Sequence, residues 1–488
     1  MLNDPISNRK SVFEPQRWGL PLHAIAHLGE RLHSFWQRHA AGFKTKTRDT
    51  SSYGLAYFSA QLRLPCGRHF AGIARSAQLS TQNMQHFMSN SPWDGRAVIA
   101  GVQQELIATP QLAGGMLLLD ESADKKSGTH SAGAGRQWNG RLGKVDLSQV
   151  GVFLAYAQGH SWSWVDGELF LPEGWFAADK AGLRQQLGIP AEREFATKVE
   201  LGWQMLKRSK AAGLPFVAVG CDELYGRSNW LRSQMNRQDI VYMADVPNDF
   251  GVYLQQPLVG VPAPKPGRHG KAPSKPRVLE ESKPLGVREV AQLADTAFVR
   301  LTVRNTERGR LVAEFAARRV WTERDGLWSG TEWLLIRREQ SGEYSYSLSN
   351  APSDCALEQL AFYKSQRCFV ERANQDAKSE LGWDELAAQK YRAWEHHLAL
   401  TILASWFIVQ TKLEWAERHE RDPQLTAEME VDILPALSMA NVRAMLRAAL
   451  PLPQLTPEQA ADLVVEHLVN RTRSRKSRLK RQHLKPLS

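Results

Sequence analysis

Apolar runs in the middle of the chain predict buried strands separated by helices. The first three strands follow one another without a helix, and a turn of a few residues between the second and third predicts a hairpin. Two more strands come later, each after a helix. The first strand ends in an aspartate, and an aspartate also follows the fourth strand. We expect strands at residues 115–120, 150–157, 162–171, 215–221 and 240–244, and helices at 197–212 and 228–236.

This order of elements is that of an RNase H-like core, an α/β fold in which a mixed five-stranded sheet is flanked by helices. In that topology the ends of the first and fourth strands are neighbours. Asp120 and Asp222 stand at these two strand ends. The fold therefore predicts that residues 109–250 form the first part of the core and bring the two carboxylates together.

A long insertion interrupts the predicted core before helices resume. Residues 251–290 are rich in Pro, Gly and Lys, which indicates a basic, extended linker. Residues 291–352 contain four β-branched or aromatic runs and predict a β-rich subdomain. The second part of the core, residues 353–422, should supply a helix from about 357 to 381 and another from about 385 to 420, whose apolar face includes Trp394, Leu398, Ile402 and Trp406.

Both ends of the chain are predicted to be helical, over residues 1–108 and 423–488. Within the first region, residues 69–88 resemble a helix-turn-helix, with an apolar first helix, a turn near Ser80 and a polar second helix. The second helix would present donors and acceptors to base edges from Gln82, Asn83 and Gln85. Helix pairs of this appearance also occur in proteins that bind no DNA, so the segment alone leaves both interpretations open.

The charge balance favours a polyanionic partner. The chain has 62 Lys and Arg against 51 Asp and Glu, a formal charge of +11 and a pI near 9.5. A dense cluster in the last residues predicts a disordered arm that binds a polyanion, or alternatively a tail that only improves solubility. Its cations are Arg471, Arg473, Arg475, Lys476, Arg478, Lys480, Arg481 and Lys485.

Cysteine usage and the N-terminal sequence favour a reducing, cytosolic setting. The four cysteines form no CxxC pair, so neither a disulfide framework nor a zinc ribbon is indicated. The N-terminus has no apolar core of a signal peptide, and the longest apolar run, 398–409, is too short to span a bilayer. We therefore expect a cytoplasmic protein without a membrane partner.

A third carboxylate lies on the first of the late helices, in the sequence YKSQRCFVERANQDAK of residues 363–378. If this segment is helical, Arg367, Glu371 and Lys378 share one face, because steps of four and seven residues nearly complete whole turns. That face places a carboxylate between two cations, an arrangement suited to a site where a metal ion meets a phosphate.

Asp120, Asp222 and Glu371 together offer hard oxygen ligands for two divalent ions, Mg²⁺ with Mn²⁺ as a substitute. Two such ions support in-line phosphoryl transfer without a covalent nucleophile. Glu380 is the alternative third ligand, although it projects from nearly the opposite side of the helix. Candidates for phosphate contact are Arg367, Lys378, Lys125, Lys126, Arg136 and Arg227, with Arg473, Arg475 and Lys476 in the tail.

These motifs resemble the bacterial insertion-sequence transposases with an Asp-Asp-Glu (DDE) site, over about residues 90–390. The matching pieces are LLLDESADKKSGTHSAGAGRQWNGRLGKVDLSQV, LPEGWF, EFATKVELGWQML and PFVAVGCDELYG. The late helix resembles the Tyr-Arg-Glu-Lys signature of one branch, and Arg367, Glu371 and Lys378 keep its spacing. Lys364 occupies the position of the signature tyrosine, and Tyr363 precedes it.

The resemblance implies a DNA transposase whose catalytic residues are Asp120, Asp222 and Glu371. Such an enzyme binds terminal inverted repeats of double-stranded DNA, cleaves the ends and joins the 3′-hydroxyls to target DNA, usually as a homodimer that synapses two ends in the bacterial nucleoid. Trp321 or Trp328 of the insertion would stack on a flipped base. The alternatives are an RNase H-like endonuclease without strand transfer and a non-catalytic regulator derived from a transposase.

Overall fold

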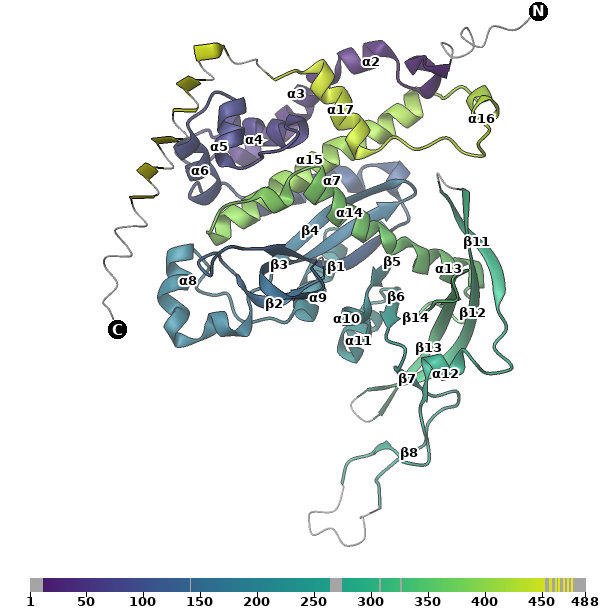
Figure 1. The fold of residues 1–488 in the computed structure, drawn as a ribbon. Coiled ribbons are helices and arrows are strands. Elements are labelled where there is room, and N and C mark those ends of the chain that lie inside the picture. Colours follow the sequence, from purple (N-terminus) through teal and green to yellow (C-terminus); the bar gives the residue numbers. More distant parts are fainter. Residues whose placement is uncertain are drawn as a thin grey trace, which may run out of the picture.

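A long mixed sheet runs through the molecule and carries helices on both faces (Figure 1). The computed structural model describes residues 12–140, 142–263, 274–306, 309–324 and 327–452, and parts of 456–476. The sheet has ten strands in the order β11-β12-β13-β14-β6-β5-β1-β3-β2, and β4 also pairs with β3. This strand order places the strands of the predicted core between those of the insertion and β2.

The five strands of the predicted core are all present and adjacent. They are β1 (Gly115–Lys125), β3 (Lys144–Gln158), β4 (Ser161–Leu169), β5 (Phe216–Cys221) and β6 (Tyr242–Val246). β1 pairs antiparallel with β3 and parallel with β5, and β5 pairs parallel with β6. This mixed α/β arrangement is compatible with an RNase H-like core. The short strand β2 (Gly135–Asn139) was not predicted.

The insertion extends the core sheet and does not form a sheet of its own. Its strands are β11 (Val299–Thr306), β12 (Gly309–Arg324), β13 (Leu327–Arg338) and β14 (Tyr344–Ser349). β14 pairs antiparallel with β6, so the sheet has ten strands where five were expected. Sequence periodicity identifies strands but not their partners, which explains the error.

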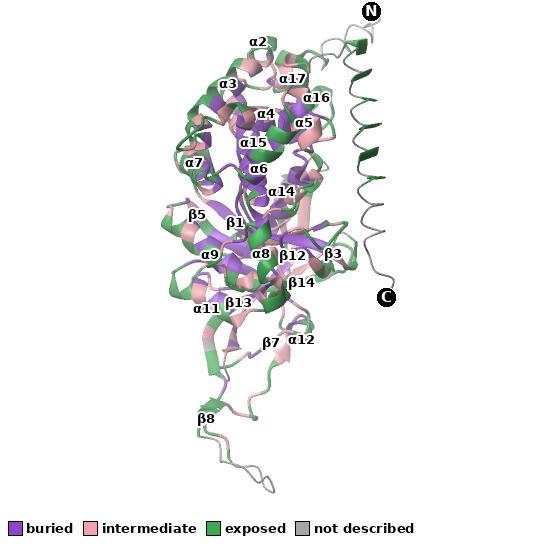
Figure 2. Ribbon diagram, turned by 90° about the vertical axis from the view of Figure 1, so that its left-hand side faces the viewer, coloured by how far each residue is buried: buried purple, intermediate pink, exposed green. Residues whose placement is uncertain are grey.

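The segment predicted to be a linker contains short paired strands. These are β7 (Gly251–Val252), β8 (Val259–Gly260), β9 (Arg277–Val278) and β10 (Leu285–Gly286), followed by α12 (Val287–Val290). β8 pairs with β9 on an arm that extends away from the body of the molecule (Figures 1 and 2). Part of the predicted linker, residues 264–273, lies outside the described residues.

Helices surround this sheet and form most of the N-terminal region. Before β1 they are η1 (Pro15–Trp18), α2 (Leu22–Ala26), α3 (Leu28–His39), η2 (Ala40–Phe43), α4 (Ser51–Arg63), α5 (Phe70–Ser76), α6 (Thr81–Ser89), α7 (Gly95–Ile107) and η3 (Pro110–Leu112). Those between β4 and β6 are η4 (Glu173–Phe176), η5 (Ala178–Lys180), α8 (Ala181–Leu187), α9 (Lys198–Ala211), α10 (Glu223–Gly226) and α11 (Asn229–Arg237). After β14 follow α13 (Leu357–Gln366), α14 (Cys368–Ser379), η6 (Trp383–Glu385), α15 (Tyr391–Arg418), α16 (Gln424–Glu428) and α17 (Met439–Ala449).

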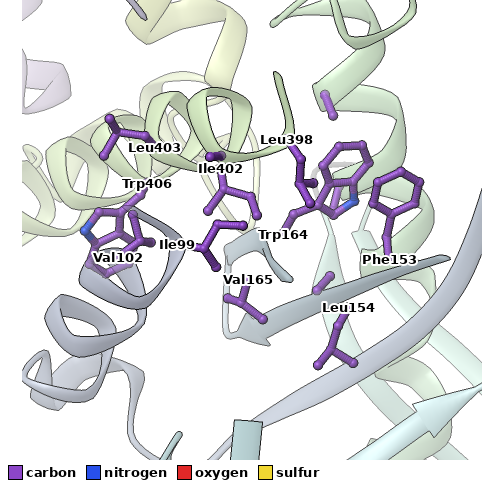
Figure 3. Close-up of a cluster of buried hydrophobic side chains, with 14 of the residues drawn as sticks. Ile99, Val102, Phe153, Leu154, Trp164, Val165, Leu398, Ile402, Leu403 and Trp406 are labelled. Atoms are coloured by element: carbon purple, nitrogen blue, oxygen red, sulfur yellow. The ribbon is translucent and has the colours of Figure 1, made fainter. Parts of the chain in front are cut away.

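The long helix α15 is the centre of the hydrophobic core. Leu398, Ile402 and Trp406 pack against α7 and β4, as Figure 3 shows. Side chains are buried all around this helix, and its purple ribbon lies in the middle of the molecule in Figure 2. A helix that is apolar on all sides must be enclosed by other elements. The predicted apolar face is thus confirmed, and one core joins the N-terminal helices, the sheet and α15.

The structure also shows the state of the cysteines and the character of the helices. The four cysteines, Cys66, Cys221, Cys355 and Cys368, are all free. Within the residues described, no helix combines the length and apolar character needed to cross a membrane.

Candidate active site

The first two predicted carboxylates, Asp120 and Asp222, are neighbours where two adjacent inner strands leave their pairing. We call this end of the strands the carboxylate edge of the sheet. β1 and β5 run parallel, and Leu119 lies opposite Cys221. Asp120 and Asp222 each come directly after this pair. Because successive side chains of a strand point to opposite faces, Leu119 packs against Gly202 of α9 whereas Asp120 points to α14 on the other face.

The surroundings of these carboxylates favour their protonated forms. Burial and then the neighbouring charge of Asp222 raise the pKa of Asp120 to about 7, from an ordinary value of 3.8. Burial and the charge of Glu121 likewise raise the pKa of Asp222, whose side chain accepts hydrogen bonds from the backbone N–H groups of Leu224 and Tyr225. Two neighbouring, half-buried carboxylates disfavour being charged together, a condition that a bound cation relieves.

The predicted single helix is in fact two helices, and its break lies at Arg367. α13 ends at Gln366 and α14 begins at Cys368. α14 crosses the carboxylate edge of the sheet: the side-chain amide of Asn374 donates to Asp120 at 3.2 Å and accepts from the indole of Trp164 at 2.9 Å. Glu371 lies three residues before Asn374, so it is one helical turn away from the residue that touches Asp120.

Glu371 is turned toward Arg367 in this structure. Its carboxylate is 58% exposed and forms an ion pair with the Arg367 guanidinium at 2.9 Å. Among the described residues, no three His, Cys, Asp or Glu side chains converge closely enough to hold a metal ion. The alternative ligand, Glu380, instead pairs with Arg443 of α17 at 2.6 Å and is engaged in packing the C-terminal helix.

Asp245 of β6 joins α13 and α14 to the sheet, and no sequence pattern pointed to it. Its carboxylate accepts from Lys364 at 2.6 Å, from Arg367 at 3.1 Å and from the hydroxyl of Ser347 at 2.8 Å. Lys364 is buried, with 7% of its side chain exposed. The cation in the position of the signature tyrosine thus has a buried partner, and the same partner orients Arg367.

Arg367 is placed between all of these acids. Besides its ion pairs, its positive charge lowers the pKa of both Asp120 and Asp222 against the opposing effect of burial. Lys378 lies two turns beyond Glu371 on α14, where it contacts the carbonyl of Ala123 and the carboxylate of Asp124 at 3.0 Å each. The two signature cations are therefore anchored to the sheet on either side of Glu371.

The other predicted phosphate contacts differ in their exposure. Arg136 and Arg227 are exposed, and Lys125 is exposed beside Asp146 at 3.4 Å. Lys126 is half-buried and donates to the carbonyl of Leu386 at 3.3 Å, and burial lowers its pKa. A phosphate contact by any of these four residues stays a prediction.

The predicted helix pair and its polar face are present in the N-terminal region. α6 begins at Thr81, and the Ser80 hydroxyl caps it by accepting from the N–H of Asn83 at 3.4 Å. Gln82, Asn83 and Gln85 are exposed. Their contact with DNA stays a prediction.

The tail and the two insertion tryptophans are the remaining predicted DNA contacts. Arg473, Arg475 and Lys476 are exposed, whereas the last residues, 477–488, and Arg471 lie outside the described part of the chain. Trp321 is half-buried and its backbone pairs with that of Tyr253, and Trp328 is 39% exposed near the end of the β12–β13 pair. Base stacking by either tryptophan stays a prediction.

Comparison with known protein families identifies the class of protein to which this fold and pair of carboxylates belong. Residues 40–310 match the model of a family described as DDE superfamily endonuclease, and this match covers more than half of the chain. The chain therefore belongs to the DDE superfamily of endonucleases, which confirms the resemblance drawn from its motifs. The matched region contains Asp120 and Asp222 and ends before Glu371.

A curated relative is consistent with this assignment. Over 155 residues the chain is 30% identical to a probable transposase for insertion sequence element IS701 from Microchaete diplosiphon. The alignment covers 30% of this chain and 35% of that protein. The chain thus matches about a third of the length of this relative, and the family supports a nuclease or transposase in general terms.

Proposed function

We propose that this protein is a transposase that cleaves DNA at the ends of an insertion sequence and joins the resulting 3′-hydroxyls to target DNA. The observation that carries the proposal is the contact between Asn374 of α14 and Asp120. This contact brings the turn of helix that holds Glu371 to the sheet edge where Asp120 and Asp222 meet. An Asp, Asp and Glu in that order at one site is the arrangement expected of the family.

The donor set fits a divalent ion. Asp120 and Asp222 are hard oxygen ligands, and burial, followed by the charges of neighbouring carboxylates, raises their pKa values, an effect that a bound cation would oppose. Glu371 is exposed and can exchange its ion pair with Arg367 for a place beside them. Bound Mg²⁺ or Mn²⁺ ions would supply activation of the attacking oxygen and stabilisation of the leaving oxygen.

The chain's own residues then bind and orient the DNA. Once Glu371 has left Arg367, the guanidinium remains held by Asp245 and becomes available to a phosphate near the scissile bond. Arg136 and Arg227 are exposed and would offer further contacts to phosphates. Positive charge at these positions would favour the developing anion of the transition state.

Strand transfer is the activity that tests this proposal. A labelled duplex carrying the inverted repeat that borders the gene for this chain, incubated with Mg²⁺ and a target plasmid, should yield joined product. Nicking without joining would identify an endonuclease instead, and binding without nicking a regulator. A homodimer that synapses two ends should appear as a complex with two labelled duplexes.

Removing the basic tail tests its contribution to DNA binding. Deletion of the residues after Asn470 should weaken binding to all DNA sequences, because the tail neutralises phosphates without reading bases. The plot of log affinity against log salt should become less steep by about 0.9 for each phosphate that the tail no longer neutralises. Fluorescence anisotropy at several salt concentrations measures both quantities, and an unchanged slope would assign the tail to solubility.

A further inference from the structure

A two-stranded ribbon projects from the carboxylate edge of the sheet. β1 pairs with β3 from Met116 opposite Ala157 as far as Lys125 opposite Ser148. β4 leaves β3 earlier, at Leu169 opposite Gly151. The first residues of β3, 144–147, pair with β2, and the carbonyl of Leu147 also accepts from the N–H of Lys126, directly after β1. The two strands of this ribbon are residues 136–139 and 144–147. They extend the sheet beyond the C-terminal end of β1, on the side of Asp120.

One face of the ribbon exposes apolar side chains. Trp138 lies opposite Val145, and they are 56% and 48% exposed. Trp138 is the most exposed of the 16 tryptophans in the chain, most of which are buried. Arg136 stands two residues before Trp138 on the same strand face and is also exposed. A free apolar face next to a cation indicates a surface that a partner covers.

Buried hydrogen bonds tie the ribbon to the sheet, one from Asn139 at the turn end of β2 and others at the base. The Asn139 amide donates to the hydroxyl of Ser148 at 3.0 Å in a buried contact, and Gln149 donates to the carbonyl of Ala132 at 2.6 Å. The N–H of Ala132 in turn donates to the carbonyl of Gln389 at 2.8 Å. The base is therefore tied to the segment that leads from α14 into α15, and the exposed face has a fixed orientation.

Charge and position identify the partner as DNA. Exposed Arg136 shares the face of Trp138 and Val145. Lys144 is also exposed but points to the opposite face, because it is next to Val145 in the strand, and Asp146 on that face is paired with exposed Lys125. Val145 precedes Phe153, the partner of Asp120, by eight residues, which is about 27 Å along a strand. That distance equals the rise of about eight base pairs of B-DNA at 3.4 Å per step.

We infer that the ribbon of residues 136–139 and 144–147 grips the duplex within about one helical turn of the scissile bond, with Trp138 and Val145 against the sugars and base edges of a groove and Arg136 on a phosphate. A two-stranded ribbon fits a DNA groove, and apolar side chains can wedge between base steps. This inference rests on the proposed function for the location of the scissile bond, but the DNA contact itself can be measured without cleavage.

The test compares variants of the full chain in a Glu371→Gln background, which keeps the DNA uncut. Trp138→Ala should bind the inverted-repeat duplex about tenfold more weakly, as expected when an aromatic ring no longer packs against DNA, with the salt slope unchanged. Trp138→Phe should recover most of the affinity. Arg136→Gln should reduce the salt slope by about 0.9. Hydroxyl-radical footprints of Trp138→Ala should lose protection about eight base pairs from the cleavage position that the active enzyme defines.

A pair of valines provides a matched control. Val145 and Val217 are exposed to similar extents, 48% and 45%, but Val217 lies at the other end of the parallel strands, near the start of β5. Val145→Ala should weaken binding and Val217→Ala should not. Equal binding by Trp138→Ala and the parent would overturn the inference, as would a Trp138→Ala variant that changes only the oligomeric state. Trp138-dependent binding without any cleavage by the unmodified chain would instead refute the proposed function alone.

Discussion

Replacing Asp120 by asparagine should abolish DNA cleavage and, in metal-free protein, remove part of the dependence of stability on pH. The carboxylate of Asp120 is the group that contacts α14 and lies beside Asp222, so the loss of its charge removes a ligand for any divalent ion. Asp222→Asn and Glu371→Gln should abolish cleavage as well. All three variants should still bind the inverted repeat.

The pH dependence follows from the direction of the pKa shift. Folding raises the pKa of Asp120 from 3.8 to about 7, so the folded protein binds more protons between these values than the unfolded chain does. The free energy of unfolding therefore falls as pH rises from about 4 to about 7 and is constant above, by at most about 4 kcal/mol from this group. Asp120 is half-buried and keeps some contact with water, which makes the actual change smaller.

Urea unfolding in EDTA at several pH values measures this effect. The free energy of unfolding of Asp120→Asn minus that of the parent should increase from pH 4 to pH 7, whichever protein is the more stable at pH 4. Added Mg²⁺ should stabilise the parent at pH 8 and leave Asp120→Asn unchanged. Asp295→Asn is the matched control, because Asp295 is an exposed carboxylate of the insertion, paired with Arg318. Full cleavage by any of the three site variants would remove that residue from the proposed metal site.

The neighbouring strand ends could be predicted because short-range patterns specify them. Apolar runs followed by Asp120 and Asp222 identify two buried strands, and the order of elements then permits only a few sheet topologies. The parallel pairing of β1 with β5 confirms that step. The position of α14 over the same edge also agrees with the spacing of Glu371 and Lys378.

Contacts between distant polar residues could not be predicted in the same way. Asp245 is, in the sequence, one more residue near a strand end, and its importance depends on Lys364 and Arg367, which reach it only after the long insertion. The pairing of β14 with β6 has the same origin. A close approach of backbones is equally hidden: a Cβ on Gly226 would lie 1.9 Å from the carbonyl oxygen of Asp245.

Replacing Asp245 by asparagine should therefore be the most destabilising single change near the site. It leaves the Lys364 ammonium buried without a carboxylate, and breaking a buried ion pair in this way costs about 3–5 kcal/mol. Thermal or urea unfolding measures the loss. Glu314→Gln is the control, since Glu314 pairs with Arg338 at a more exposed position of β12 and β13, where a pair contributes about 0–1 kcal/mol.

A double variant separates stability from the positioning of Arg367. Asp245→Asn with Lys364→Met removes both buried charges, so it should regain most of the stability that the single variant lacks. Arg367 would still lack its ion pair with Asp245 of β6, which orients it. Its ion pair with Glu371 would remain. We expect DNA cleavage by the stable double variant to be reduced by at least about tenfold, the equivalent of about 1.4 kcal/mol in the barrier, with binding little changed. Cleavage at the rate of the parent would show that Asp245 serves stability alone and that Arg367 reaches its working position without it.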